Sequence, residues 1–279
     1  MKPLEFDPGS VLVIDFNNAV YRARAGFHRG DHAVTYTFML MLRKLVERVD
    51  PSEVFIVLEG HPRHRHELLP SYKEGRASPG DSFWSQHTDI IGLMSHLPVH
   101  VVRHPDLECD DVIAHVVRVM RPMSRCTVVS TDTDFIQLLD TTDSRIKLYN
   151  PVKDVFVPAT SYDYVMWKSL TGDGTDGVPG FKGIGPARAA AMLGNSDKLA
   201  DFLSDADNRA KFDRNVGLIV FADVPDGLEE VRHSLQPSEL LSAFKDRGFK
   251  SLLEEKRWTR FTSTFEAIEF RQALGGVSQ

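Results

Sequence analysis

The chain has 279 residues, of which 42% are hydrophobic and 26% are charged, which is typical of a globular protein with one large or two modest domains. It has no apolar stretch long enough to span a membrane and no signal-peptide pattern. Its two cysteines are too few for a disulfide framework, so we expect a cytoplasmic protein. The net charge of −6 argues at first against a nucleic-acid partner, but nine clustered acids account for it, and the rest of the chain would carry a small positive charge.

Short apolar runs rich in β-branched residues predict strands at 11–14, 54–58, 99–102 and 127–129. The spacing of apolar residues predicts an amphipathic helix over 34–49, and a second helix is expected over about 110–120. Strands that alternate with helices predict an α/β fold, with a mostly parallel central sheet flanked by helices. Sites in such sheets lie at the carboxyl ends of the strands.

Beyond about residue 160 the strand signals fade, and helical patterns separated by Gly- and Pro-rich turns dominate. This change predicts a boundary near residue 160. We therefore expect an α/β core over 1–160 and a helical region over 161–279.

The nine acids stand mostly at the ends of apolar runs. Asp15, Glu59 and Asp132 each follow a predicted strand, so they should converge on one rim of the sheet. Acids gathered in this way repel one another without a counter-ion, and Mg²⁺ and Mn²⁺ take oxygen ligands. Two such ions a few ångströms apart can cleave a phosphodiester. The remaining acids of the set are Glu108, Asp110, Asp111, Asp134, Asp173 and Asp176.

Plainer explanations exist for some of these acids. Asp15 could begin a turn or cap a helix, and an acidic helix N-terminus explains one or two of the residues in 108–111. The acids of 132–134 include a possible N-cap, and 172–177 could be an ordinary loop. The number of clusters nevertheless favours a metal site.

Residues 180–188, GFKGIGPAR, place glycines before a helix that begins at Pro186, a pattern that favours contact with phosphates of duplex DNA. A simple packing corner between helices is the alternative. The candidate DNA-binding residues are Gly180, Lys182, Gly183, Ile184, Gly185 and Arg188.

A basic stretch follows Glu59. Lys73 and Arg76 are expected to contact the substrate, and the nearby aromatic residues could stack on unpaired bases; a solvated charged face is the alternative. The histidines of 61–66 lack cysteine partners, which argues against zinc. The aromatic residues are Tyr72, Phe83 and Trp84.

In this order the motifs resemble the 5′–3′ exonuclease and flap endonuclease family, which includes the N-terminal nuclease domain of bacterial DNA polymerase I and free-standing phage 5′ nucleases. The resemblance extends from about residue 11 to residue 221. The matching segments are VLVIDFNNAVYR, LLPSYKEGR, ECDDVIA, STDTDFIQLL and LTGDGTDGVPGFKGIGPARAA.

The resemblance implies a PIN-like nuclease core with a basic helical arch over about 61–84. It also implies a helix–three-turn–helix over about 172–193, which grips duplex DNA and in some members holds K⁺. By the same resemblance, Lys73 and Arg76 contact the scissile phosphate, Arg22 lies at the foot of the active site, and Tyr72 stacks on a base. The metal-binding acids it implies are Asp15, Glu108, Asp110, Asp132 and Asp134, and those of the second metal or its water shell are Asp111, Asp173 and Asp176.

Two positions depart from the family pattern. Glu59 stands where the family usually has Asp, and the extra methylene could shift the ion or admit a water molecule, which would alter rate or metal preference. Gly177 stands where Asn is common, and we expect this change to matter less.

The resemblance implies an enzyme that uses two Mg²⁺ or Mn²⁺ ions to cleave branched, nicked or 5′-ended DNA in replication or repair, with RNA primer–DNA hybrids as a further candidate substrate. Nothing in the composition demands a dimer, so we expect a monomer. Two alternatives stay open. A PIN-like RNase shares the acid cluster but is typically shorter and lacks the helix–three-turn–helix. A DNA-binding module with a vestigial site would bind branched DNA without cleaving it. The sequence does not separate exonuclease from endonuclease action.

Overall fold

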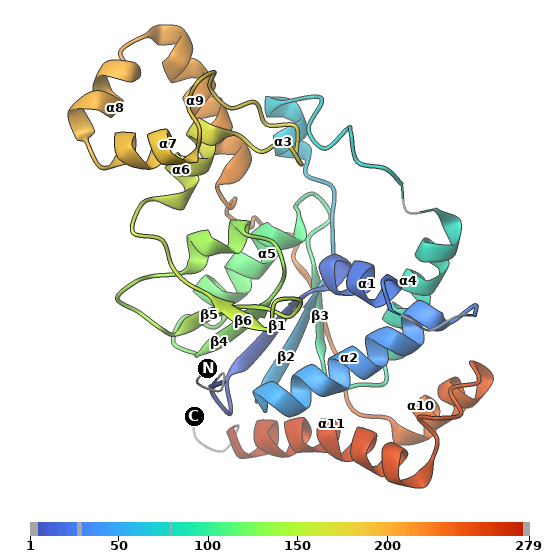
Figure 1. The fold of residues 1–279 in the computed structure, drawn as a ribbon. Helices are drawn as coiled ribbons and strands as arrows, with labels where there is room; N and C mark the ends of the chain where they lie inside the picture. The colour runs from blue at the N-terminus through green and yellow to red at the C-terminus, as the bar shows by residue number, and fades with distance from the viewer. Residues whose placement is uncertain (1–4, 27–29, 79, 276–279) are drawn as a thin grey trace.

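The computed structural model describes residues 5–26, 30–78 and 80–275, and its centre is a seven-stranded sheet of order β6-β5-β4-β1-β2-β3-β7 (Figure 1). The five inner strands run parallel and the two edge strands antiparallel, which confirms the predicted α/β fold. The strands are β1 (Val11–Asp15), β2 (Glu53–Val57), β3 (His100–Arg103), β4 (Cys126–Val129), β5 (Ile146–Asn150), β6 (Val155–Val157) and β7 (Glu229–Arg232).

Helices cover both faces of the sheet. Alternate residues of β1 enter two cores: Leu12 and Ile14 pack on one side, and Val11 and Val13 on the other. The first side is covered by α1 (Phe16–Arg24), α2 (Ala33–Val49), α4 (Asp81–Met94), α10 (Pro237–Asp246) and α11 (Glu255–Gly275). The second is covered by α5 (Cys109–His115), the π-helical turn Val116–Met120 and the 3₁₀ turn Asp134–Leu138. No helix in the described ranges combines the length and the apolar character that a membrane crossing requires.

A smaller group of helices lies beyond the carboxyl ends of the strands, at the top of Figure 1. It has an apolar core of its own, to which Leu170, Phe181 and Phe212 contribute. Its members are α6 (Tyr164–Thr171), α7 (Pro186–Leu193), α8 (Ser196–Phe202) and α9 (Ala206–Ile219), and the short α3 (Arg63–Leu68) contacts α9.

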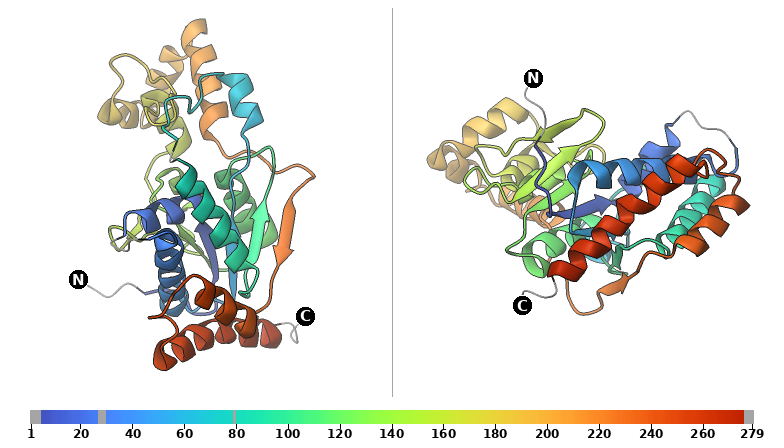
Figure 2. Two further views of the ribbon diagram at one scale, coloured as in Figure 1. Left: turned by 90° about the vertical axis from the view of Figure 1, so that its right-hand side faces the viewer. Right: turned by 90° about the horizontal axis from the view of Figure 1, so that it is seen from below.

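The C-terminal part of the predicted helical region 161–279 is helical apart from β7, but it packs on the α/β body and not with α6–α9. β7 pairs with β3, and Figure 2 shows α10 and α11 beside α2, at the end of the molecule away from α6–α9. Phe244, Phe261 and Phe265 are fully buried in the core that they share with α2. Burial of this aromatic face explains why the segment folds back.

A buried ion pair joins the helices above the sheet to the sheet itself. The side chains of Arg65 on α3 and Asp111 on α5 are 2% and 0% exposed, and two N–H···O contacts of 2.7 Å connect them. Arg65 Nε also donates to the carbonyl of Leu218 in α9 at 2.9 Å, and Asp111 accepts from the backbone N–H of Ala222 at 2.8 Å. The pair therefore fixes α3, α5 and the end of α9 relative to one another.

Replacing Arg65 with Ala should lower the free energy of unfolding by about 3–5 kcal/mol, because it leaves the buried Asp111 carboxylate without its partner. Urea denaturation measures this loss. Arg63→Ala is the matched control on the same helix: the Arg63 and Asp106 side chains form a surface pair and are 69% and 40% exposed, so the loss should stay below about 1 kcal/mol. Equal losses in the two variants would contradict the role assigned to Arg65.

Candidate active site

Two adjoining cavities open at the carboxyl ends of the strands. The first has a volume of about 340 Å³ and the second of about 610 Å³, and Asp132, Asn18 and Arg76 line both. The first is also lined by the predicted acids Asp15, Glu59, Glu108 and Asp110, and the second by Asp173 and Asp176. The chain thus brings acids from five sequence segments to one rim, as parallel strands allow.

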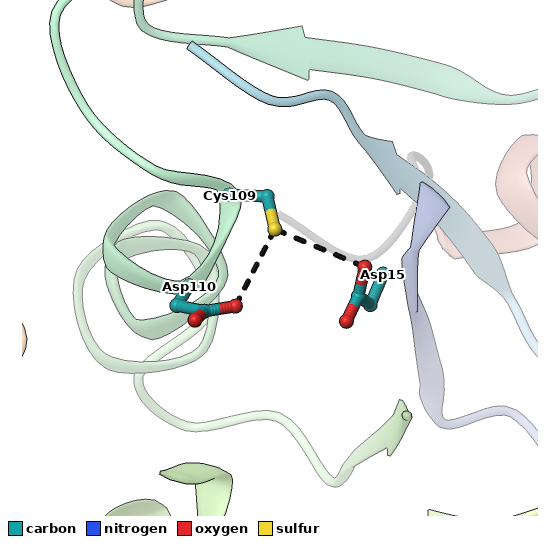
Figure 3. Close-up of side chains that lie close together, drawn as sticks. All are labelled: Asp15, Cys109 and Asp110. Carbon is teal, nitrogen blue, oxygen red and sulfur yellow. Dashed lines mark hydrogen bonds between the residues drawn. The ribbon is translucent and has the colours of Figure 1, made fainter. Parts of the chain in front are cut away.

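Asp15, the last residue of β1, combines a structural and a site role. It is the N-cap of α1, since one oxygen accepts from the backbone N–H of Asn18 at 3.0 Å, and the other accepts from Ser130 Oγ at 2.8 Å. Figure 3 shows the Cys109 thiol between Asp15 and Asp110, with Sγ–O distances of 3.8 and 3.4 Å. Asp15, Cys109 and Asp110 have potential ligand atoms within 4.8 Å of one another.

A second group of potential ligands consists of Asp134, Asp173 and Asp176, whose oxygens also lie within 4.8 Å of one another. Lys168 Nζ lies among them, 2.6 Å from Asp173 and in an ion pair with Asp134. The sequence motifs did not single out Lys168. This lysine follows Tyr164 by four residues and lies with it on the buried face of a short helix, and a lysine in such a position is rarely buried without a charged partner. Apart from the Cys109 sulfur, the donors of both groups are carboxylate oxygens, so they fit a hard divalent cation.

Burial raises the pKa of several of these acids. It raises the pKa of Asp15 to about 6 despite the hydrogen bonds from Asn18 and Ser130, and that of Asp134 to about 6 despite Lys168. Burial and the neighbouring Glu108 raise the pKa of Glu59 to about 7. Without a bound cation these acids therefore retain some of their protons near neutral pH, and binding of a cation would displace those protons.

The predicted basic residues lie against the acids. Lys73 pairs with Glu108 and lies 3.7 Å from Asp176, and Arg76 pairs with Asp176. Burial alone would lower the pKa of Lys73, but Glu108 and Asp176 raise it above its usual value. Both residues lie between α3 and α4, in the predicted arch segment 61–84, of which residue 79 is outside the described residues.

Three predicted residues have contacts that differ from their expected roles. Tyr72 is 3% exposed and its hydroxyl lies 3.1 Å from both Glu108 and Asp176, so its ring is not available for stacking on a base. Both oxygens of Asp111 are held by Arg65, which leaves them unsuited to a metal. Arg22 is half-buried and is absent from the described residues that line the two cavities.

Of the two further predicted aromatic residues, Trp84 is 44% exposed and Phe83 is 3% exposed. The Phe83 ring stacks on Tyr21, which is 45% exposed and lines the first cavity. Exposed aromatic surface beside the acids is therefore offered by Tyr21, whereas Trp84 is exposed but is not among the described residues that line either cavity.

The glycine-rich turn 180–185 is the last part of the loop between α6 and α7, and Pro186 begins α7 as predicted. Lys182, Gly183, Gly185 and Arg188 are exposed, whereas the Ile184 side chain is buried in the core of α6–α9, so only its backbone can contact a ligand. Gly180 has a packing role, because a Cβ there would lie 2.0 Å from the carbonyl oxygen of Thr171.

Comparison with known proteins identifies relatives of this architecture. Residues 10–166 match the family model described as 5′-3′ exonuclease, N-terminal resolvase-like domain. The chain is 27% identical over 288 residues to DNA polymerase I of Streptococcus pneumoniae, a match that covers 88% of this chain and 32% of the polymerase. It is 28% identical over 212 residues to the flap endonuclease Xni of Shewanella denitrificans, covering 71% of this chain and 82% of that protein.

A crystal structure of the bacteriophage T5 flap endonuclease in a complex with DNA and metal ions has the same fold, with a TM-score of 0.62 at 16% identity, over 93% of this chain and 99% of that chain. The present chain spans about a third of the length of the DNA polymerase I relatives that it matches.

Replacing Glu59 with Gln should stabilise the metal-free protein at high pH. Because the pKa of Glu59 is raised from 4.5 to about 7 in the folded state, its contribution to stability is largest at low pH and is lost as the pH rises through about 7. In EDTA we expect a gain of about 1–3 kcal/mol in the free energy of unfolding at about pH 8, and none near about pH 4.

Urea denaturation of both proteins at the two pH values measures this gain. The exposed Glu74 of the same segment supplies the control variant, Glu74→Gln, which should change neither value. A gain of equal size at both pH values would assign the effect to packing and contradict the account.

Proposed function

Because the chain belongs to the 5′-3′ exonuclease family, we propose that it is a structure-specific 5′ nuclease that cleaves phosphodiesters by flap endonuclease and 5′–3′ exonuclease action. The observation that carries the proposal is the pair of adjoining acid-lined cavities beside the exposed basic turn 180–188. The acids supply a place for divalent cations, and the turn supplies a place for the phosphates of a duplex.

We propose Mg²⁺ or Mn²⁺ as the resident ions, one at each group of ligands. Asp15 and Asp110 would hold the first, Asp134, Asp173 and Asp176 the second, and Asp132, which lines both cavities, would serve between them. When bound, the two ions activate water and stabilise the departing 3′ oxygen. Participation of Glu59 and Glu108, which line the first cavity with Asp15 and Asp110, in the first site is part of the same proposal.

The basic residues have proposed roles at the scissile phosphate. Lys73 and Arg76 contact acids in the described structure and line the first cavity, where they would meet a bound phosphate. Their charge would neutralise the charge that develops on the phosphate oxygens. Lys168 would hold Asp134 and Asp173 in position.

The substrate we propose is DNA with a 5′ flap, a nick or a free 5′ end, and RNA primer–DNA hybrids belong to the same proposed substrate class. We propose that the protein acts as a monomer in the cytoplasm, during replication or repair. Lys182, Gly183, Gly185 and Arg188 would contact the duplex backbone without reading its sequence. A K⁺ ion bound by the backbone of this turn belongs to the proposal through the family resemblance alone. The helices α6–α9 weigh against a PIN-like RNase, and the retained acids weigh against a module that only binds DNA.

Replacing Asp132 with Asn should slow cleavage of a 5′-labelled flap duplex in Mg²⁺ by more than about a hundredfold, because it removes an acid that lines both cavities. Binding of the flap should be retained or strengthened, since the site becomes less negative. Cleavage is followed on denaturing gels, and binding by fluorescence anisotropy in Ca²⁺.

The same assay separates the alternatives for the wild-type protein. Release of the flap near the junction in Mg²⁺ or Mn²⁺, and none in EDTA, supports the proposal. Flap binding without cleavage would indicate a binding module, and cleavage of single-stranded RNA alone would indicate an RNase. Full activity of Asp132→Asn would contradict the assignment of the site.

A further inference from the structure

We infer that His87 and Asn17 form a hydrogen-bonded relay that positions the Glu59 carboxylate at the first cavity, an inference that rests on the proposed nuclease function. The sequence alone did not indicate this role for His87 or for Asn17. The relay is made of three parts of the fold: His87 lies on α4, Asn17 on α1, and Glu59 two residues after β2.

The contacts are continuous from helix α4 to the acids. His87 Nε2 lies 3.0 Å from Asn17 Oδ1, and Asn17 Nδ2 lies 3.5 Å from Glu59 Oε2. Asn17 and Glu59 both line the first cavity, together with Asp15. His87 lies behind Asn17 and is the outer end of the relay.

The chemistry of the three side chains determines the direction in which the hydrogen bonds of the relay are donated. With a cation bound at the first cavity the Glu59 carboxylate is ionised and only accepts hydrogen bonds, so Asn17 must then present its NH₂ group to Glu59 and its oxygen to His87. His87 must then donate from Nε2. Burial lowers the pKa of His87, which favours the neutral ring, and the contact of Nε2 with the Asn17 oxygen requires the single proton of that ring to lie on Nε2.

Packing holds the outer end in place. The imidazole ring of His87 packs edge-on against Phe16, with ring centroids 4.7 Å apart, and against Trp84 at 5.2 Å. Phe16 is fully buried and separates Asp15 from Asn17 in the chain. One short segment therefore fixes both an acid of the site and the amide of the relay.

The relay gives a physical reason for a glutamate at position 59. The Asn17–Glu59 contact of 3.5 Å is at the limit of a hydrogen bond, so an aspartate, shorter by one methylene, would not reach the Asn17 amide. His87 is not among the described residues that line the two cavities, so it would act through Asn17 and Glu59 as a positioning residue. Partners of this kind orient metal-binding carboxylates in other proteins.

The test compares three substitutions. His87→Leu fills the space beside Phe16 and Trp84 but donates no hydrogen bond, whereas His87→Gln retains a donor. His87→Leu should weaken Mn²⁺ binding, measured by calorimetry, and lower kcat for the flap by about tenfold each, with KM for DNA unchanged. His87→Gln should recover most of both losses. His96→Ala, a histidine that contacts Gln236 away from the site, should change neither.

A double-mutant cycle with Glu59→Asp isolates the relay from a purely structural effect. In the Glu59→Asp background, His87→Leu should lower Mn²⁺ affinity by less than about twofold, because the relay is already broken. An equal loss in both backgrounds, or unchanged Mn²⁺ binding in His87→Leu alone, would overturn the inference. Wild-type protein that neither binds Mn²⁺ nor cleaves the flap would instead overturn the proposed function. Urea denaturation identifies a variant that fails to fold, in which case Asn17→Leu takes the place of His87→Leu.

Discussion

The mutual repulsion of carboxylates gathered at the ends of parallel strands is the constraint on which the rest of this structure depends. A parallel sheet places the residues that follow its strands on one rim, and here many of those residues are acids. Burial raises their pKa values, as at Asp15 and Glu59, and positive side chains such as Lys73 and Lys168 lie between them. The acids are partly neutralised by lysines of the chain itself, which indicates that this cluster requires positive charge. A bound cation would supply more of that charge.

The neutralising residues also organise the helices above the sheet. Arg65 reaches from α3 to Asp111 on α5 and to the carbonyl of Leu218 in α9. In the same region Lys73 and Arg76 connect the segment after α3 to Glu108 and Asp176. The placement of the segment that would meet the substrate therefore depends on the same charges that form the site.

The sequence was sufficient for the parts of the fold that depend on local pattern. Buried β-branched runs predicted β1 to β4, and the acids after them marked the rim correctly. It did not predict β7, which is short and exposed, or the return of α11, because both depend on contacts distant in the chain. It also misjudged Tyr72 and Asp111, since a residue type in a motif does not show whether its polar atoms already have partners in the folded protein.

Titration of Mn²⁺ into the EDTA-treated protein at about pH 6.5, in two buffers with different heats of ionisation, tests whether the acids form a site for divalent cations. We expect saturable binding with a net release of protons, because the pKa values of Asp15 and Glu59, about 6 and about 7, leave them partly protonated without metal. Asp132→Asn should bind Mn²⁺ more weakly. Absence of saturable binding, or binding with the same heat in both buffers, would contradict the assignment of this site.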